Sequence, residues 1–516
     1  MDSRKIDFNN LDGPLRLYGM DGGAYREVRD FIEAMMSSGS SNPAYEEFRR
    51  RYEYDPVGFA ENCIDWPAGE RLTDYQVKIL EALVDHQRVA VRGPHGIGKS
   101  TIASMVVLWF ALSRDTDDWK CPTTASSWQQ LTRFLWPEIR KWRLRLRWDV
   151  IGREPFDNRR EALVRSLNLD TGQAFAIASN DPASMEGAHA DNLAFVFDEA
   201  KNIPDATFDA LEGAFSGAGS DTGRDAFALA ISTPGEPVGR FYDIHQRAAG
   251  YDDWHVIHVS LEDGIASGRI DRQWAETRRT QWGESSALYQ NRVLGEFCPD
   301  DEAGIIPIAW IEESNLRWLE WNQKKEKGEV TTIGVDIGRG GDKTIFALCY
   351  DKYAIDKLQS IENKTTTPII GRAEALLGKN EHAVLIPDGI GMGATVADVI
   401  EDDGYNVLPF VASKSSDKKD RTNTFGFANL RAAAWWTLRE MLDPEYKSIV
   451  ALPPDDDLTG ELTTVQWKEA RGGKIQIESK ADIRARLRRS TDHADAVIQA
   501  LTGMELAKKT PKGSWA

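Results

Sequence analysis

The sequence has little that would tie the protein to a membrane or to an oxidising compartment. No apolar run approaches the ~20 residues of a membrane span. The first residues, MDSRKIDFNNLDG, contain no apolar core of the kind found in a secretory signal. Only four cysteines occur, at Cys63, Cys121, Cys298 and Cys349, and none are spaced as CxxC. We therefore expect a protein without disulfides or zinc, which is not secreted and works in a reducing cytoplasm.

Basic charge is also in short supply. The chain carries 63 Lys and Arg against 81 Asp and Glu, for a net charge of −18. Proteins that coat nucleic acid are usually basic, so any contact with nucleic acid would have to come from local basic patches on an acidic body. The remaining composition, 41% hydrophobic and 28% charged, is ordinary for a globular protein.

The length of 516 residues is enough for about two to four domains. Short apolar strands alternate with helical stretches in two regions, as in α/β proteins, and a charged, apolar-poor run at 323–328 lies between them. No internal repeat is visible. The predicted segments are a polar, helical appendage or lid at 1–60, a first α/β domain at 61–309, a linker at 310–330, a second α/β domain at 331–506 and a polar tail at 507–516.

The segment VRGPHGIGKST, Val91–Thr101, matches the P-loop pattern G-x-x-x-x-G-K-[ST]. A short apolar stretch at 87–92 predicts a strand before it, and the apolar run at 102–110 predicts a helix after it, so a chance glycine loop is disfavoured. Lys99 would reach the β- and γ-phosphates of ATP, and the Ser100 hydroxyl would contact Mg²⁺. The predicted phosphate-binding residues are Gly93, Gly96, Gly98, Lys99, Ser100 and Thr101.

The segment LAFVFDEA, Leu193–Ala200, predicts a buried strand that ends in two acids. Asp198 would bind ATP-associated Mg²⁺ through its water shell, and Glu199 would polarise the attacking water. Alone, such a segment is also typical of a buried strand with solvated acids at its end. Together with the P-loop it favours a hydrolysing ATPase.

Two further segments fit an ATP site. The apolar run 226–231 predicts a strand that ends in Ser232 and Thr233, which could sense the γ-phosphate or simply form a turn into Pro234. Gln76 could contact the adenine edge, although Thr73 before it is equally a helix N-cap.

The basic stretch 131–148 favours an amphipathic helix with a solvated basic face, and a stripe that contacts phosphate or another subunit is the alternative. Its predicted apolar face consists of Leu135, Ile139, Trp142 and Leu146.

The second region places acids at the ends of predicted elements. Asp336 and Asp388 each close an apolar strand, and Asp495 opens a C-terminal helix. Three such carboxylates could converge on two divalent cations, Mg²⁺ or Mn²⁺, and catalyse phosphodiester hydrolysis, with Asp342 as a fourth or outer ligand. Acids often end strands, and an actin-like sugar-kinase domain could open in the same way, although the separate P-loop makes that less attractive.

Three polar segments of this region could touch DNA, although a surface loop, a surface hairpin and a solvated helix are the plainer interpretations. They are the lysine-rich loop 413–422, the predicted hairpin 465–478, and the basic cluster of Arg484, Arg486, Arg488 and Arg489.

The motifs GPHGIGKST, FDEA, ISTP, VDIGRGGDKT, PDGIGMG and DHADA follow one another in an order that resembles the large terminase subunits of tailed phages, over about residues 60–505. NLRAAAWW, Asn429–Trp436, also resembles a helix of that family. The resemblance implies a P-loop ATPase of the additional-strand type, followed by an RNase H-like nuclease in which Asp336, Asp388 and Asp495 are the catalytic acids and Asp342 is a neighbouring acid.

The resemblance also implies partners and a place of action. A motor of this family would move double-stranded DNA into a procapsid through the portal protein, as a ring of like subunits, with a small terminase subunit, in the cytoplasm of an infected bacterium. One departure concerns the arginine that several terminases use to act on a neighbour's ATP. The stretch 184–189 contains no arginine, so Arg224 or Arg240 would have to substitute.

Two other functions remain open from the sequence. A host ATP-dependent helicase or repair nuclease would share the P-loop, although no further helicase motifs are present. An ATP motor whose C-terminal domain is a non-catalytic DNA clamp would share the order of domains.

Overall fold

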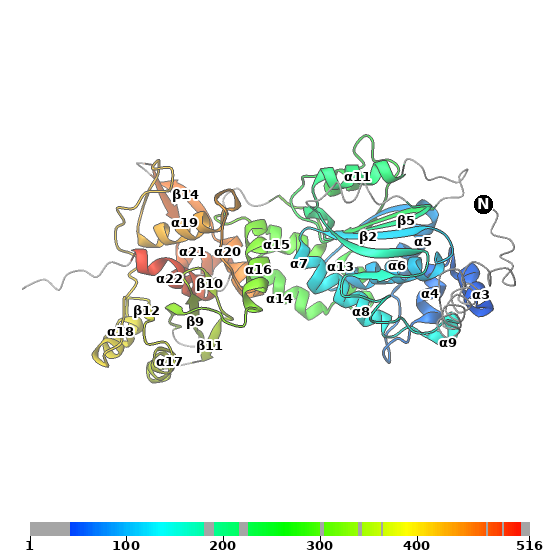
Figure 1. Ribbon diagram of the computed structural model, residues 1–516. Helices are drawn as coiled ribbons and strands as arrows, with labels where there is room; N and C mark the ends of the chain where they lie inside the picture. The colour runs from blue at the N-terminus through cyan, green and yellow to red at the C-terminus, as the bar shows by residue number, and fades with distance from the viewer. Residues whose placement is uncertain are drawn as a thin grey trace, which may run out of the picture.

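The computed structural model describes residues 42–179, 190–215, 225–299, 304–338, 343–362, 365–470, 473–487 and 490–506. Its elements form two large sheets with helices on both faces and a small third sheet, and helix α16, Ile308–Asn322, lies between the two large sheets (Figure 1). The α/β class predicted from the sequence is therefore confirmed. None of the described helices is both long enough and apolar enough to cross a membrane. All four cysteines are described, and none forms a disulfide.

The N-terminal domain is built on a seven-stranded sheet in the order β3-β4-β2-β5-β6-β1-β7. All neighbouring pairs are parallel except β3 with β4. Strand β6 lies between β1, which leads into the P-loop, and β5, which ends in the paired acids, so all three strands end at one edge. The strands are β1 Arg88–Arg92, β2 Trp119–Ala125, β3 Ser166–Asn168, β4 Gly172–Ala178, β5 Asn192–Asp198, β6 Ala226–Ser232 and β7 His255–His258.

Two groups of helices cover this sheet. One face packs against α3 to α6 and α8, and the other against α11 and α12. The helices of this domain are α3 Pro43–Tyr52, α4 Pro56–Cys63, α5 Asp74–His86, α6 Lys99–Ser113, α7 Trp128–Gln130, α8 Trp136–Arg143, α9 Trp148–Ile151, α11 Asp205–Phe215, α12 Arg240–His245, α13 Leu261–Ala266, α14 Arg272–Trp282 and α15 Ala287–Tyr289, with the short π or 3₁₀ turns η2 Leu131–Leu135, η3 Ala200–Asn202 and η4 Gln290–Leu294.

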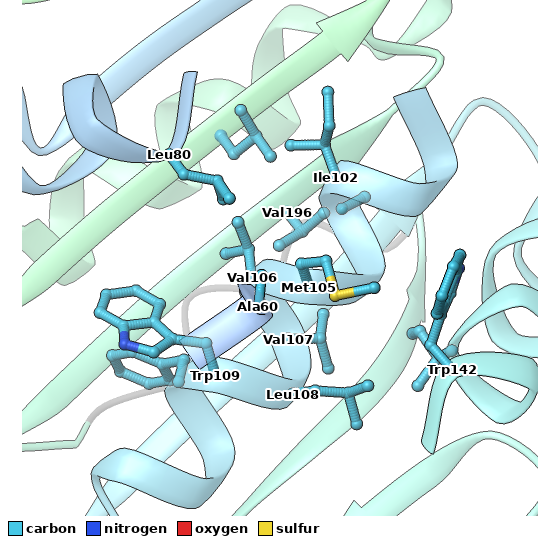
Figure 2. Packing of buried hydrophobic residues seen from close by; sticks show 14 of the residues in the cluster. Ala60, Leu80, Ile102, Met105, Val106, Val107, Leu108, Trp109, Trp142 and Val196 are labelled. Carbon is cyan, nitrogen blue, oxygen red and sulfur yellow. The ribbon is translucent and has the colours of Figure 1, made fainter. Parts of the chain in front are cut away.

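Helix α6 holds the P-loop in place because nearly its whole surface is covered. It is apolar on all sides, which is the pattern of a fully buried helix rather than a surface helix. Figure 2 shows Met105, Val106 and Leu108 inside a shell that includes Leu80 and Val196. The start of the helix, and with it the glycine-containing loop before it, is therefore fixed by the core.

The stretch 131–148 forms two consecutive short helical elements, η2 and α8, followed by a turn. The predicted apolar face is confirmed, since Leu135, Ile139, Trp142 and Leu146 are all buried. Arg140 and Arg147 are exposed, and whether they contact only solvent or instead phosphate or another subunit stays open.

The C-terminal domain is built on a five-stranded sheet with β10-β9-β8-β12 as its path and β11 paired to β9. Strands β8 and β9 are antiparallel, whereas β8 and β12 are parallel and end at the same edge. Helices α19 and α22 pack on one face, and α17 and α18 on the other. A small sheet, β13-β15-β14, contains the predicted hairpin.

The strands of this domain are β8 Val330–Asp336, β9 Lys343–Tyr350, β10 Ala354–Ile355, β11 Gln359–Glu362, β12 Val384–Pro387, β13 Gly426–Phe427, β14 Trp467–Ala470 and β15 Lys474–Ile477. Its helices are α17 Thr367–Leu377, α18 Met392–Asp402, α19 Leu430–Leu442, the 3₁₀ turn η5 Pro444–Tyr446, α20 Asp456–Thr464, α21 Lys480–Leu487 and α22 Asp492–Leu506.

Helix α22 lies unusually close to β8, and a glycine makes this approach possible. A Cβ atom at Gly334 would lie 2.1 Å from the carbonyl oxygen of Ala496. Thr332 and Gln499 add hydrogen bonds, the first to the Ala500 carbonyl and the second to the Val335 amide. The close contact brings the start of α22 to the end of β8.

Most of the segment predicted as a linker is the helix α16. It packs against the C-terminal domain, where Ser314 bonds to the backbone of Val450 and Leu452, and the Trp318 indole donates to the Ile355 carbonyl. The connection between the two sheets is therefore a helix belonging to the second domain, and the charged run at 323–328 follows its end.

Candidate functional site

The P-loop has the backbone shape that a phosphate would need. Gly96 and Gly98 adopt φ values of 88° and 78°, in the region that favours glycine. The Lys99 ammonium donates to the Pro94 carbonyl at 2.8 Å, so it lies inside the curl of the loop. A Cβ atom at Gly93 would lie 2.6 Å from the Ile97 side chain. The backbone at Gly96 and Gly98 therefore favours glycine, and phosphate binding by the loop stays a prediction.

Two residues of α5 support the loop from behind. The Tyr75 hydroxyl and the Gln76 amide both donate to the Ile97 carbonyl. The Gln76 amide oxygen also accepts from the Thr73 backbone, which completes a capping box at the start of α5. The predicted N-cap is confirmed. Gln76 is fully buried in these contacts, and its contact with adenine stays a prediction.

Thr101 faces away from the loop. Its hydroxyl donates to the Glu138 carboxylate on α8 at 3.1 Å, which links the first turn of α6 to its neighbour. A direct role in nucleotide binding stays a prediction, whereas its packing role is visible.

The acids of β5 lie at the same edge of the sheet as the P-loop. Asp198 ends the strand, and Glu199 follows it in a left-handed conformation with φ 50°. Ser232 and Thr233, at the end of β6, place their hydroxyl oxygens 3.1 Å and 3.5 Å from Glu199 Oε2. The strained backbone and these two contacts hold the Glu199 carboxylate in one orientation.

The charges of this site are strongly coupled. Burial raises the pKa of Asp198 to about 7, with Glu199 adding to the effect and Lys99 opposing it. Burial lowers the pKa of Lys99 to about 8, against the attraction of Glu199 and Asp198. A site that shifts these groups so far is typical of functional chemistry.

The edge of the first sheet opens into a cavity of about 610 Å³. Ser100, Asp198 and Glu199 line one side of it, and residues of α16 and α20 line the other. The predicted ATP residues and the C-terminal domain thus share one cavity.

The C-terminal domain has its own cavity, of about 450 Å³, lined by Asp336, Asp388 and Asp495. Asp336 and Asp388 come from the ends of the parallel strands β8 and β12, and Asp495 lies in the first turn of α22. The structure therefore brings together three of the four predicted acids. Asp342 lies outside the described residues.

A lysine lies between two of these acids. The Lys480 ammonium is 3.2 Å from Asp336 Oδ1 and 2.8 Å from Asp495 Oδ2. No three acidic, histidine or cysteine side chains of the described chain are arranged to hold a metal ion. Lys480 occupies the position between the two carboxylates, and metal binding by these acids stays a prediction.

The pKa values of these two acids shift in opposite directions. Burial raises the pKa of Asp336 well above its usual value, with Asp495 and Asp492 adding to the effect and Lys480 opposing it. Burial would also raise the pKa of Asp495, but Lys480 and Arg431 outweigh it and hold this pKa below its usual value. Asp495 therefore favours its ionised form more than Asp336 does.

All three predicted DNA-contacting segments meet at this cavity, since Ser413, Gln476 of the predicted hairpin and Arg484 line it. Arg486 is instead bound to Glu478 and the Thr464 carbonyl. Arg488, Arg489, Arg224 and the stretch 184–189 lie outside the described residues. Arg240 forms an ion pair with Asp209 at 2.6 Å and stacks over Tyr251, so its role as an arginine finger stays a prediction.

Several residues of these sites had no signal in the sequence. Lys480 and Arg431 reach Asp495 from separate helices, and Lys201, Arg292 and Glu312 line the first cavity. Arg431 lies in NLRAAAWW, and Lys201 closely follows the paired acids. For the others, no pattern along the chain would have revealed the contact.

Fold and sites define a mixed α/β protein with a candidate phosphate-binding edge in one domain and a carboxylate-lined cavity in the other. Its sequence is similar along nearly its whole length to large terminase subunits, as its motifs suggested. It is 25% identical over 497 residues to the "Probable terminase, large subunit" of Enterobacteria phage P7, covering 90% of this chain and 94% of that protein. It is 24% identical over 321 residues to the "Terminase, large subunit" of Thermus phage G20c, covering 57% of this chain and 59% of that protein.

Solved structures similar to the chain carry related names. The large terminase of a thermophilic bacteriophage matches with a TM-score of 0.39 and 14% identity, over 85% of this chain and all of that one. The nuclease domain of the large terminase subunit gp2 of bacterial virus Sf6 matches with a TM-score of 0.33 and 18% identity, over 38% of this chain and 97% of that one. No family model matches the chain.

Proposed function

We propose that the chain is the large subunit of a phage terminase, an ATP-driven motor that moves double-stranded DNA into a procapsid and cuts it with a metal-dependent nuclease. One observation carries the proposal. Two chemically different sites, a P-loop edge and a carboxylate cavity, occur in one chain that is similar to a terminase large subunit over 90% of its length.

The first domain would be a P-loop ATPase of the additional-strand type, which the position of β6 between β1 and β5 supports. Lys99 would bind the β- and γ-phosphates, and Ser100 and Asp198 would hold Mg²⁺. Glu199 would take up the proton of the attacking water, because its carboxylate is held by Ser232 and Thr233 at the edge where the phosphates would lie.

The second domain would be an RNase H-like nuclease. Bound Mg²⁺ or Mn²⁺ would supply charge stabilisation for phosphodiester hydrolysis. Asp336, Asp388 and Asp495 would hold the ions, with Asp342 beside them. Arg484 and Ser413, at the rim, would contact the DNA backbone, and Lys480 would leave the position between Asp336 and Asp495 that it occupies here.

The proposed partners follow from this role. They are double-stranded DNA, the portal protein of the procapsid, a small terminase subunit and further copies of the chain in a ring, in the cytoplasm of an infected bacterium. The net charge of −18 is compatible with a motor that must slide along DNA rather than adhere to it.

A plasmid-cutting assay tests the nuclease. The purified chain is incubated with supercoiled plasmid and a titration of Mn²⁺ or Mg²⁺, beside Asp336→Ala and Asp398→Ala. Asp398 is an exposed aspartate of the same domain and serves as the matched control. We expect cutting by the wild type and by Asp398→Ala, and none by Asp336→Ala, with ATPase activity retained in all three.

Other results would point elsewhere. A folded wild type that cuts at no metal concentration would leave an ATP motor with a C-terminal DNA clamp. ATPase and cutting activity without binding to a portal protein would favour a helicase or repair nuclease. Loss of both activities in a folded Asp336→Ala protein would contradict two separate sites.

A further inference from the structure

Three charged side chains form a cluster across the cavity that the P-loop edge shares with the C-terminal domain. The Lys201 ammonium lies 3.1 Å from Glu312 Oε2, and an Arg292 guanidinium nitrogen lies 3.3 Å from Glu312 Oε1. A single carboxylate therefore holds two cations.

Both cations belong to the phosphate side of this cavity. Lys201 lies in η3, directly after the strained Glu199, and its stem passes 3.2 Å from the position of a Cβ on Gly235. The Arg292 carbonyl accepts a hydrogen bond from the backbone of His95 in the P-loop. Ser100 and Asp198 line the same cavity.

The carboxylate, by contrast, belongs to the C-terminal domain. Glu312 lies on α16, whose other side is bonded to Val450 and Ile355 of that domain. A second acid of the same domain, Asp456 on α20, lies 3.7 Å from Arg292. The C-terminal domain thus brings two acids, Glu312 and Asp456, to Lys201 and Arg292.

Glu312 is charged in its contact with the two cations. Burial would raise the pKa of Glu312, but Lys201 and Arg292 outweigh it and hold the pKa below its usual value, so the carboxylate is ionised. Arg292 Nε is buried and has no hydrogen-bond partner among the described residues. The guanidinium therefore keeps a donor that Glu312 does not use.

We propose that Lys201 and Arg292 bind the terminal phosphate of the nucleotide, and that Glu312 holds their donors when this phosphate is absent. The proposal rests on the proposed ATPase function. A phosphate offers the same charge and the same oxygen acceptors as the carboxylate, so the two compete for one pair of cations. Both of these cationic side chains, Lys201 and Arg292, belong to the proposed ATPase domain.

The competition has a mechanical consequence. When the terminal phosphate binds, Glu312 is released and α16 loses its contact with Lys201 and Arg292. After hydrolysis and phosphate release, the contact forms again. The C-terminal domain would in this way be held by the ATPase domain in the absence of ATP and released in its presence.

Nucleotide binding to the purified full chain tests the proposal. Dissociation constants for a non-hydrolysable ATP analogue and for ADP are measured by calorimetry on the wild type, Lys201→Ala, Glu312→Gln and Arg278→Gln. Arg278 pairs with Asp457 across the same domain boundary and does not line the cavity, so it controls for a weakened boundary.

The expected effects have opposite signs. Lys201→Ala should weaken binding of the ATP analogue by about tenfold, because a charge-assisted contact to the terminal phosphate is lost. It should change binding of ADP little. Glu312→Gln should tighten binding of the ATP analogue several-fold, because the charge that competes with the phosphate is gone. Arg278→Gln should change neither. A Glu312→Gln protein that binds the analogue as the wild type does, or more weakly, would overturn the proposal.

Failure of the ATPase proposal would look different. In that case the wild type would bind neither nucleotide, and Lys99→Ala would have no effect. Wild-type binding that is lost in Lys99→Ala, without opposite effects of Lys201→Ala and Glu312→Gln, would reject only the competition.

Discussion

The hydroxyl oxygen of Ser232 lies 3.1 Å from the carboxylate of Glu199, at the edge of the sheet where two neighbouring strands end. Glu199 itself has a left-handed backbone, which a non-glycine residue adopts at a cost. The contact and the strain together point the carboxylate of a candidate general base toward the P-loop side of the cavity.

Glu199→Gln should abolish turnover without abolishing ATP binding. An amide keeps the shape of the side chain but cannot accept the proton of the attacking water, so kcat should fall by about a hundredfold or more. Steady-state hydrolysis and nucleotide binding, measured on the same preparation, separate the two effects. Equal loss of binding would mean that Glu199 mainly shapes the site.

Ser232→Ala should lower kcat by about tenfold and leave KM nearly unchanged, because the carboxylate loses a contact that orients it. Ser179→Ala is the matched control, since Ser179 is a buried serine after β4 whose hydroxyl bonds to the Ser126 carbonyl. If both substitutions slow turnover equally, the effect is one of packing in the sheet and not of orientation.

Gly393→Ala should impair the nuclease and spare the ATPase. A Cβ atom at this position would lie 1.9 Å from the Asp388 carbonyl oxygen, so the end of β12 and its carboxylate must shift. We expect plasmid cutting to fall by about tenfold or more, since small displacements of catalytic groups are costly.

Gly371→Ala gives the comparison for that substitution. Gly371 lies within α17 of the same domain, and a Cβ there would meet no atom within 4 Å. It should leave cutting unchanged and slightly raise the melting temperature, since alanine favours a helix by about 1 kcal/mol over glycine. Equal losses in the two variants would contradict the geometric argument.

Trp109→Ala should destabilise the N-terminal domain by about 3–5 kcal/mol, as a large buried aromatic leaves a cavity. Trp109 is fully buried in α6, and its indole donates to the Tyr52 carbonyl at 2.6 Å. Urea unfolding followed by fluorescence measures the change. Trp128→Ala, at a tryptophan that is 41% exposed, should cost about 0.5 kcal/mol or less. Similar costs at both sites would show that α6 is not the centre of the core.

Stability of the N-terminal domain should fall in mild acid because of His245. Burial, with Arg92 and His258 nearby, lowers the pKa of this histidine to about 3 from 6.5. The folded state therefore keeps the ring neutral while the unfolded state takes up a proton. The contribution of the neutral His245 ring to the stability of the folded state is fully present above pH 6.5 and is lost as the pH falls toward 3.

His245→Phe should reduce this acid sensitivity, since phenylalanine cannot take up a proton in the unfolded state. The difference between wild type and variant should grow by up to about 1.4 kcal/mol per pH unit below the unfolded pKa. Melting temperatures at neutral and mildly acidic pH measure it, with His382→Phe, at an exposed histidine, as control. Parallel pH profiles of wild type and His245→Phe would contradict the prediction.

Local pattern was enough to predict the elements that carry the sites. The strands that end at Asp198, Ser232 and Asp336 are confirmed, because an apolar run closed by a polar residue is typical of a buried strand that ends at a sheet edge. The helix after the P-loop is also confirmed. Its apolar residues extend over its whole circumference.

The same local pattern misjudged how the elements connect. The charged run at 323–328 led to a predicted linker at 310–330, yet α16 packs tightly on the C-terminal domain through Trp318 and Ser314. The burial of this helix depends on partners at Val450 and Ile355, far along the chain. Gln76 is a similar case, since its amide serves the α5 cap and the P-loop.

The sequence by itself determined the class of fold, the order of the two domains and the residues at the sheet edges, because each of these is a property of neighbours along the chain. Only the tertiary structure decided which distant charges meet. Lys480 between Asp336 and Asp495, and Glu312 between Lys201 and Arg292, are contacts of electrostatic partners from different helices and loops. Coulomb energy depends on distance in space, and packing alone sets that distance.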